Sequence, residues 1–206
     1  MSKVIVNKEN LKLVEKYIDA GNPKFELDYL FVDTDNENLV ATDTRTLAIA
    51  KCDTVSKGNF YVHKKLVSLA IKQTKAIEYH LEKNKITCLD RDDIELVVFS
   101  LEKDFYNKYE ERFHYPDYKR IIPKETKHKI PFVSYSAIEG ILNLNKIVVD
   151  TKRIPTKSTR YLKDYDGGFI KFNDAEMPIT IEDNKDGSMI IIMPIVDKFE
   201  VFREGN

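Results

Sequence analysis

Two prolines restrict the backbone in the middle of this chain. Residues 115–123 read Tyr-Pro-Asp-Tyr-Lys-Arg-Ile-Ile-Pro, an aromatic and basic stretch with a proline near each end. A proline fixes its own φ and moves the preceding residue out of helical space. Pro116 and Pro123 therefore keep Tyr115 and Ile122 out of a helix. The sequence predicts a stiff, extended connector here, with folded chain on both sides.

The length and hydrophobic content of the chain allow one large or two small domains. Of the 206 residues, 42% are hydrophobic, which is enough for real cores. Charged residues make up 33% of the chain, but the net charge is only -1. No global positive field therefore draws the protein to nucleic acid or to an anionic membrane, so contact with DNA must come from local patches.

The cysteines and the N-terminus indicate a reduced, cytoplasmic setting. Cys52 and Cys88 are the only cysteines, they lack CxxC spacing, and the first ten residues contain no apolar signal-peptide core. The longest apolar run, at 189–193, is far shorter than the roughly 18 residues of a membrane span and fits a buried strand. We expect no association with a membrane.

The first 101 residues read as two similar halves, each with a short strand, an amphipathic helix and then paired strands. In the first half, a helix begins near Asn7 or Asn10 and ends near Asp19. In the second half, the helix covers 64–74. The strands predicted from β-branched and aromatic alternation are 4–6, 25–33, 39–42, 46–51, 60–62, 77–81, 85–89 and 94–101.

A second domain of residues 131–206 follows a connector of residues 102–130. Only one helix, at 134–144, is predicted in it with an apolar face. The strands predicted there are 146–150, 168–172, 177–182 and 188–196, with a further candidate at 199–202.

Three separated segments carry a resemblance to one family. Residues 115–123 are similar to the connector between the second and third domains of the bacterial DNA polymerase III β subunit, the sliding clamp. Residues 40–48, Val-Ala-Thr-Asp-Thr-Arg-Thr-Leu-Ala, resemble its ATDGHRLA strand-turn-strand. Residues 179–183 and 190–195 resemble its last strand pair, which ends in VVMPM. The resemblance implies α+β DNA-clamp domains, with antiparallel sheets and helices on one face, and a shortened second domain.

The resemblance also implies a cleft for a short hydrophobic motif from a polymerase or clamp loader. The residues carried over by position are Thr42, Thr44, Arg45, Thr46 and Leu47, then Pro116, Arg120 and Ile121 of the connector, and Ile191, Met193, Pro194 and Ile195 of the last strand. Thr44 replaces a glycine of the family's pattern and Thr46 an arginine, which crowds the mouth and makes it less basic. Residues 198–202 extend past the usual end and could cover or extend the cleft. The alternative interpretation is a plain interdomain core.

Lysines at helical spacing are candidates for contact with DNA phosphates, which needs only positive charge and reads no base. The resemblance supports this, because the helices of a clamp line the hole of a ring. The alternative is a solvated helix face, since Glu9, Glu15 and Asp19 dilute the first stripe. The candidates are Lys8, Lys12, Lys16, Lys64, Lys65, Lys72 and Lys75, with Lys152, Arg153, Lys157, Arg160 and Lys163 of a basic stretch that is either a DNA-touching loop or a flexible insertion.

Enzyme signatures are missing from the sequence. The four histidines have no HExxH or Cys-His spacing, and there is no GxSxG or GxxxxGK motif. The acidic turn at 33–38 does not fit a calcium loop, because Asn38 stands where glycine is required and Thr44 at the twelfth position. We expect no catalytic residue, no metal and no cofactor.

The sequence therefore predicts a DNA sliding clamp or clamp-like processivity factor. Its expected partners are double-stranded DNA, bound nonspecifically, and a polymerase and clamp loader. Two domains per chain make a cyclic trimer if six domains close a ring. One alternative is a clamp-fold protein that regulates replication without encircling DNA, which the acidic Glu139 in the predicted helix of the second domain favours. The other is a metal-dependent nuclease, supported only by scattered aspartates.

Overall fold

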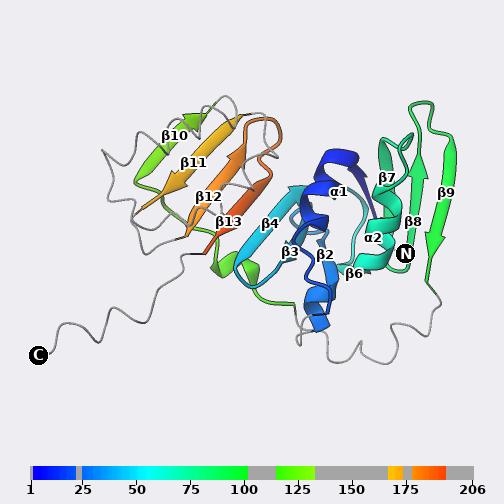
Figure 1. The fold of residues 1–206 in the computed structure, drawn as a ribbon, viewed down its shortest axis with the longest axis horizontal. Coiled ribbons are helices and arrows are strands. Elements are labelled where there is room, and N and C mark those ends of the chain that lie inside the picture. Colours follow the sequence, from blue (N-terminus) through cyan, green and yellow to red (C-terminus); the bar gives the residue numbers. More distant parts are fainter. Residues whose placement is uncertain (1, 22–24, 102–114, 133–166, 174–177, 194–206) are drawn as a thin grey trace, which may run out of the picture.

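Two antiparallel sheets and two α-helices make up the described part of the chain (Figure 1). The computed structural model describes residues 2–21, 25–101, 115–132, 167–173 and 178–193. Sheet A has the strand order β5-β1-β7-β8-β9, and sheet B has the order β10-β11-β12-β13-β4-β3-β2-β6. The predicted α+β class with antiparallel sheets is confirmed.

The elements follow the repeated order that the sequence suggested. Those of the first 101 residues are β1 (Lys3–Asn7), α1 (Lys8–Glu15), the 3-10 helix η1 (Phe25–Asp28), β2 (Tyr29–Asp33), β3 (Asn38–Thr42), β4 (Thr46–Lys51), β5 (Asp53–Ser56), β6 (Phe60–His63), α2 (Lys64–Ile71), β7 (Glu78–Glu82), β8 (Lys85–Leu89) and β9 (Glu95–Ser100). The later ones are the 3-10 helix η3 (Tyr118–Arg120), β10 (His128–Phe132), β11 (Gly168–Phe172), β12 (Ile179–Asp183) and β13 (Met189–Ile192).

Sheet B joins strands from the first 101 residues to strands from residues 128–192. Strand β13 pairs with β4 in antiparallel register, and Ile191 lies opposite Leu47. Strands β10 to β13 therefore continue the sheet that β2, β3, β4 and β6 begin, and Figure 1 shows them side by side. Two of the three segments that carry the resemblance thus meet through main-chain pairing.

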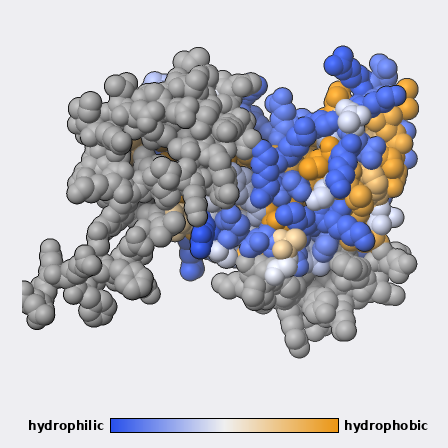
Figure 2. Space-filling model, viewed as in Figure 1, coloured by the Kyte–Doolittle hydropathy of each residue, from blue (hydrophilic) through white to orange (hydrophobic). Residues whose placement is uncertain are grey.

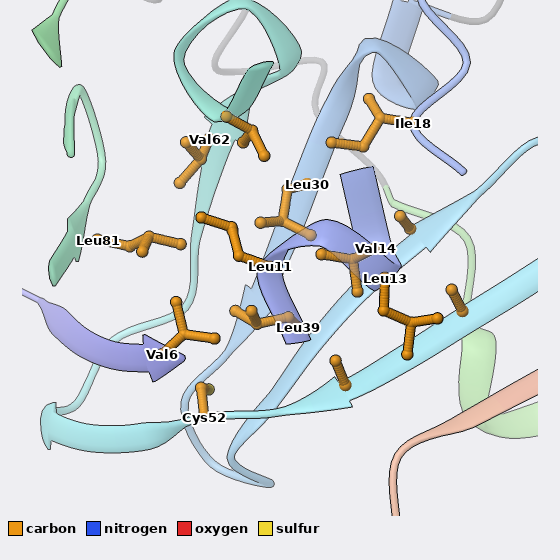
Figure 3. Packing of buried hydrophobic residues seen from close by; sticks show 14 of the residues in the cluster. Val6, Leu11, Leu13, Val14, Ile18, Leu30, Leu39, Cys52, Val62 and Leu81 are labelled. Atoms are coloured by element: carbon orange, nitrogen blue, oxygen red, sulfur yellow. The ribbon is translucent and has the colours of Figure 1, made fainter. Parts of the chain in front are cut away.

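The main core lies between the helices and the sheets. Helix α1 packs on β3 and β4, α2 packs on β8 and β9, and the helices pack on each other. Leu11 and Val14 of α1 lie close to Leu30 and Leu39 of sheet B (Figure 3), and all four are fully buried. Helix α1 therefore buries an apolar face, as predicted for an amphipathic helix.

Both helices are shorter than predicted. Asn7 caps α1 by accepting a hydrogen bond from the Asn10 N–H at 2.8 Å, but the helix ends at Glu15 and not near Asp19. The amides of Tyr17 and Ile18 bond to carbonyls three residues back, so the last turn tightens and leaves the α-helical path. Helix α2 ends at Ile71 and not at residue 74, and the Gln73 amide makes the same kind of bond to Ala70.

One strand prediction also differs from the structure, and two strands were not predicted. Residues 25–28 form η1, so the first strand of the predicted hairpin starts only at Tyr29. Strand β5 was not predicted, because its four residues are mostly polar and show no apolar alternation. It lies at the edge of sheet A, where polar side chains are tolerated. Strand β10 was not predicted either, and it crosses the expected domain boundary at 130. Its Pro131 is tolerated because β10 is the last strand of sheet B in the described part of the chain.

The connector is not extended throughout. Residues 118–120 form η3, closed by a 3.1 Å hydrogen bond from the Ile121 N–H to the Tyr118 carbonyl. The prolines on either side restrict only their own and the preceding residues, which leaves this turn free to form. The elements predicted at 134–144, 146–150 and 199–202 lie outside the described residues.

Candidate functional site

A second apolar cluster lies on the face of sheet B that turns away from the helices. Side chains alternate along a strand, so Ala48 and Ala50 of β4 belong to the main core while Leu47 and Ile49 point to the opposite face. We call this second group the outer cluster. It consists of the buried residues Val40, Leu47, Ile49, Tyr118 and Ile191 and the partly buried residues Phe31, Tyr115, Ile121, Ile122 and Met189.

The connector covers part of this cluster with aromatic side chains. The ring of Tyr115 stacks on Phe31 with centroids 5.2 Å apart and an interplanar angle of 23°. Its hydroxyl donates to the Val40 carbonyl at 3.2 Å, and Tyr118 meets Phe31 edge-on at 6.4 Å. Stacked and edge-on rings add to the apolar burial. The connector is therefore fixed on β2 and β3.

The β3–β4 turn is held by its own side chains. One carboxylate oxygen of Asp43 accepts from the amides of Arg45 at 3.0 Å and Thr46 at 2.7 Å. The Thr42 hydroxyl donates to the Thr46 carbonyl at 2.7 Å and accepts from the Thr44 amide at 3.2 Å. Thr44 adopts a left-handed φ of 75°. Glycine suits such a position better than a β-branched residue, which explains why the resembled pattern has glycine there.

The last described residue of the chain joins this turn. The Met193 N–H donates to the Arg45 carbonyl at 2.9 Å, directly beyond the paired strands β13 and β4. Met193 is partly buried, whereas Arg45 is exposed. The main chain of the turn is therefore bonded to the residue that directly follows β13, the strand that supplies Ile191 to the outer cluster.

The structure brings together three of the predicted cleft residues, Leu47, Ile121 and Ile191, in the outer cluster. Thr42, Thr44 and Arg45 lie in the adjoining turn with Met193, but Thr46 is buried and, by strand alternation, points to the helix side. Pro116 and Arg120 are exposed, and Arg120 pairs with Asp117 at 2.9 Å. Pro194 and Ile195 lie outside the described residues.

A buried carboxylate anchors the connector beside the cluster. Asp33 accepts a 2.7 Å hydrogen bond from the Tyr118 hydroxyl and two from the Asn36 side-chain amide at 2.9 Å, and the Lys119 ammonium lies 3.3 Å away. Burial alone would raise the pKa of Asp33. The hydrogen bonds from Asn36 and Tyr118 and the charge of Lys119 outweigh it, so the pKa lies below its ordinary value.

Sequence reasoning missed the aromatic part of this site. Tyr115, Tyr118 and Phe31 were not among the predicted residues, although the density of aromatic residues in the connector was visible. The alternation of residues 29–33 could have indicated Phe31. Leu30 and Val32 face the main core, so Phe31 between them must face the other side of the sheet.

The predicted DNA-facing lysines fall into two groups. The ammonium of Lys8 donates to the carbonyls of Gln73, Thr74 and Ala76 at 2.8, 3.0 and 3.0 Å, and burial lowers its pKa. That of Lys64 donates to the Ile18 carbonyl. The remaining predicted lysines of the first 101 residues are exposed, and they are Lys12 of α1, Lys16 directly after it, Lys65 of α2, and Lys72 and Lys75 beyond its end.

The other predicted DNA contacts belong to the basic stretch of the second domain. Lys152, Arg153, Lys157, Arg160 and Lys163 lie outside the described residues.

The described part of the chain gives little support for a reactive thiol, a metal site or a membrane-spanning helix. Cys52 and Cys88 are buried, which raises the pKa of the two thiols to about 12 and about 11. Neither is thus a thiolate at neutral pH. Within the described ranges, no three His, Cys, Asp or Glu residues lie close enough to hold a metal ion. Of the helices described, none has the length and hydropathy to span a membrane.

The fold has close counterparts among solved structures. The DNA polymerase III β subunit of Borrelia burgdorferi superposes with a TM-score of 0.63 over 94% of this chain and 62% of its own, at 16% identity. The DnaN sliding clamp of Bartonella birtlesii, bound to griselimycin, gives 0.63 over 95% and 66%, also at 16% identity. This chain has the sliding-clamp fold. The Helicobacter pylori β clamp bound to a DNA ligase peptide gives 0.60 over 95% and 66%, at 14% identity.

The sliding-clamp fold is thus shown by structure and not by overall sequence similarity. No protein-family model and no curated protein matches the sequence. The chain spans 62% to 66% of the length of these clamps. The resemblance inferred from three motifs is confirmed at the level of the fold.

Proposed function

We propose that this protein is a DNA sliding clamp or a clamp-like processivity factor. It holds double-stranded DNA without reading sequence and tethers a replicative polymerase or clamp loader through a short hydrophobic peptide. The observation that carries the proposal is the meeting of the three motif segments at the outer cluster of a sliding-clamp fold. The protein performs no catalysis and acts in the cytoplasm, where a tethered partner stays at high local concentration.

The peptide site is proposed at the outer cluster and the β3–β4 turn. Ile121, Met189 and Met193 are partly buried there, so apolar surface remains accessible beside the buried Leu47 and Ile191. Methionine side chains adapt to several apolar ligands. The peptide bound by the Helicobacter pylori clamp supports this kind of partner for the fold.

The DNA contact is proposed on the exposed lysines of the two helices. We leave Lys8 and Lys64 out of this surface, because main-chain carbonyls already bind their ammonium groups. Lys12, Lys65 and Lys72 are exposed and supply positive charge without base-reading geometry. Such contacts let the protein slide.

Assembly of several chains is proposed through the edge of sheet A. Strand β9 is the last strand of this sheet in the described part of the chain, and Ile94, Leu96 and Val98 are 58%, 38% and 38% exposed. Figure 2 shows hydrophobic surface along this edge. An apolar edge strand favours pairing with another chain. Three two-domain chains joined in this way give a six-domain ring.

Retention on circular DNA tests the proposal. The protein is expected to stay on a circular plasmid through a salt wash and to be lost when the plasmid is cut, because enclosure ends at a free DNA end. Light scattering after size-exclusion chromatography is expected to give three chains per particle.

A second candidate is a clamp-fold protein that binds the peptide but does not encircle DNA. A monomer that binds peptide and shows equal retention on cut and circular DNA would support this candidate. Magnesium-dependent cleavage of the plasmid would contradict both.

A further inference from the structure

The β12–β13 turn docks on the first domain through hydrogen bonds between the exposed Asp186 and the buried Asn10 and Ser188. One carboxylate oxygen of Asp186 accepts from the Asn10 side-chain amide at 2.7 Å, and the other accepts from the Ser188 N–H at 2.8 Å. The Ser188 hydroxyl accepts from the Lys51 N–H at 3.1 Å, and Asn10 also donates to the Lys51 carbonyl at 3.0 Å. Asn10 and Ser188 are 8% and 1% exposed. We call this set of bonds the turn contact.

The connector docks through a second buried set. The Tyr118 hydroxyl donates to Asp33 and accepts from the Asn38 side-chain amide at 3.3 Å. The Asn38 side-chain oxygen in turn accepts from the Lys51 ammonium at 2.9 Å. Asn38 and Tyr118 are 8% and 3% exposed. We call this set the connector contact.

Lys51 is the one residue that both contacts share among those just named. Its main-chain N–H and carbonyl belong to the turn contact, and its ammonium belongs to the connector contact. It is the last residue of β4, the strand that supplies Leu47 to the outer cluster and pairs with β13. A continuous hydrogen-bonded path thus runs from Asp186 to Asp33 along one end of the cluster.

Charge supports the same arrangement. The hydrogen bonds from Ser188 and Asn10, together with the nearby positive charge of Lys51, hold the pKa of Asp186 below its ordinary value although burial acts in the opposite direction. Lys51 therefore stabilises an anion at one contact while it donates a hydrogen bond at the other. Asn38 is buried, so its side-chain oxygen is costly to leave without the Lys51 ammonium as donor. Opening of one contact displaces Lys51 and therefore weakens the other.

We propose that the Lys51 side chain is a positioning residue that couples the two contacts, so that the connector and the β12–β13 turn close on the first domain together. Closure keeps the connector and β13 on the two sides of the outer cluster. The effect on peptide binding rests on the proposed function, whereas the coupling itself does not.

Hydrogen exchange of two amides reports the contacts separately. The Ile121 N–H bonds to Tyr118 in the connector, and the Asp183 N–H bonds to the Ser188 carbonyl at 2.8 Å in the turn. Lys51→Met keeps the main-chain bonds and the aliphatic stem but removes the ammonium. We expect exchange at both amides to quicken roughly tenfold in the full-length protein, as loss of a charged hydrogen bond predicts. Lys57→Met, at an exposed lysine, is the matched control and should change neither rate.

A coupling cycle separates positioning from simple loss of stability. Ser188→Ala breaks the turn contact and should quicken exchange at Ile121 in the chain that has Lys51, but add nothing in Lys51→Met. Should Ser188→Ala leave Ile121 unchanged, or quicken it equally in both backgrounds, the coupling through Lys51 is refuted.

A second variant, Tyr118→Phe, tests the same coupling if the Lys51→Met protein does not fold. Tyr118→Phe keeps the ring and removes only the hydroxyl, and it should quicken exchange at Asp183, in the other contact. An unchanged rate there would also refute the coupling. These rates are measured without peptide, so peptide binding that fails in the wild type overturns the proposed function and leaves the coupling standing.

Discussion

The Tyr118 hydroxyl donates a 2.7 Å hydrogen bond to a carboxylate oxygen of Asp33, a residue 85 positions earlier in the chain. Both side chains are almost fully buried, and Lys119 lies next to them at 3.3 Å from the same carboxylate. The connector is therefore attached to the β2–β3 hairpin by a charged, buried contact as well as by stacked rings. Loss of that charge should loosen it.

Asp33→Asn is expected to lower the free energy of unfolding at pH 7 by about 1–3 kcal/mol, the range for hydrogen bonds to charged groups. The folded-state pKa of Asp33 is depressed, so its contribution is present above the unfolded pKa and is lost as pH falls through the folded pKa. The difference between wild type and variant should therefore shrink in acid below about pH 4. Urea denaturation at a series of pH values measures it.

The exposed Asp35 of the same turn offers a control. Asp35→Asn should leave stability near that of the wild type at every pH. Equal losses for Asp33→Asn at pH 7 and pH 3 would contradict the charged state of Asp33.

A histidine caps the second helix, which makes its start sensitive to pH. The ring Nδ1 of His63 accepts from the Lys65 N–H at 3.0 Å, so the cap needs the neutral ring. Burial lowers the pKa of His63, and the charge of Lys65 also lowers it while that of Asp28 raises it. The folded state therefore resists protonation.

Stability is accordingly expected to fall as pH drops below about 6.5, because the unfolded chain then binds a proton that the folded chain does not. His63→Asn supplies a cap that does not titrate, and it should remove this part of the pH dependence while other groups titrate alike in both proteins. Thermal melts from pH 7.5 to 5 compare the two. Parallel pH curves for wild type and variant would show that His63 makes no such contribution.

The fold class followed from the resemblance of three motif segments, whereas most strands could be predicted from local sequence patterns. Alternating β-branched and aromatic residues placed β2 to β4 and β7 to β9 within a few positions. What the sequence could not show depends on contacts between distant residues. The attachment of Lys8 to the end of α2 and of Lys51 to the connector leaves no periodic pattern.

The same distinction applies to the candidate site. Leu47, Ile121 and Ile191 were predicted from their motifs and do come together, but Tyr118 was visible only as part of a basic, aromatic run. Its burial follows from η3, a short turn set by tertiary contacts with Asp33 and Phe31. Thr46 was assigned to the cleft by position, yet the pleat of β4 turns it to the helix side.

Thr44 occupies a left-handed position that glycine tolerates better. With φ at 75°, its β-branched side chain costs more than the entropy that a glycine loses on folding. We expect Thr44→Gly to raise the free energy of unfolding by about 0.5–1 kcal/mol. Thr42→Gly, two residues earlier, should lower it, because the Thr42 hydroxyl bonds to Thr46 and Thr44. Chemical denaturation measures the free energy of unfolding of both variants. A lower value for Thr44→Gly than for the wild type would contradict backbone strain at Thr44.

Lys65 of α2 and Lys72, the residue that caps its C-terminus, are expected to contribute to DNA retention. Lys65→Glu with Lys72→Glu reverses two charges on an exposed face, so retention on circular DNA should weaken, and the difference from wild type should shrink as salt rises. Lys85→Glu changes one charge on β8 of sheet A and serves as the control. Unchanged retention of the double variant at low salt would exclude α2 from the DNA contact.

The apolar peptide site is expected to depend on Met193 more cleanly than on Leu47. Met193 is partly buried and bonded through its main chain to the β3–β4 turn, whereas Leu47 is 2% exposed within the outer cluster. Met193→Ala should weaken binding of a short hydrophobic peptide by about 1–3 kcal/mol with little change in thermal stability. Leu47→Ala should also lower the free energy of unfolding by about 2–5 kcal/mol, because it leaves a cavity.

Calorimetric titration of the DNA ligase peptide that the Helicobacter pylori clamp binds, alongside thermal melts, measures both effects. The double variant should not bind, and Val55→Ala, at a valine 56% exposed on β5, should bind as the wild type does. If the wild type binds no peptide at all, or if Met193→Ala unfolds as readily as Leu47→Ala, the outer cluster is an interdomain core. Binding that is lost while folding persists identifies it as a ligand site, since an accessible apolar surface loses contact with its partner before it loses its own support.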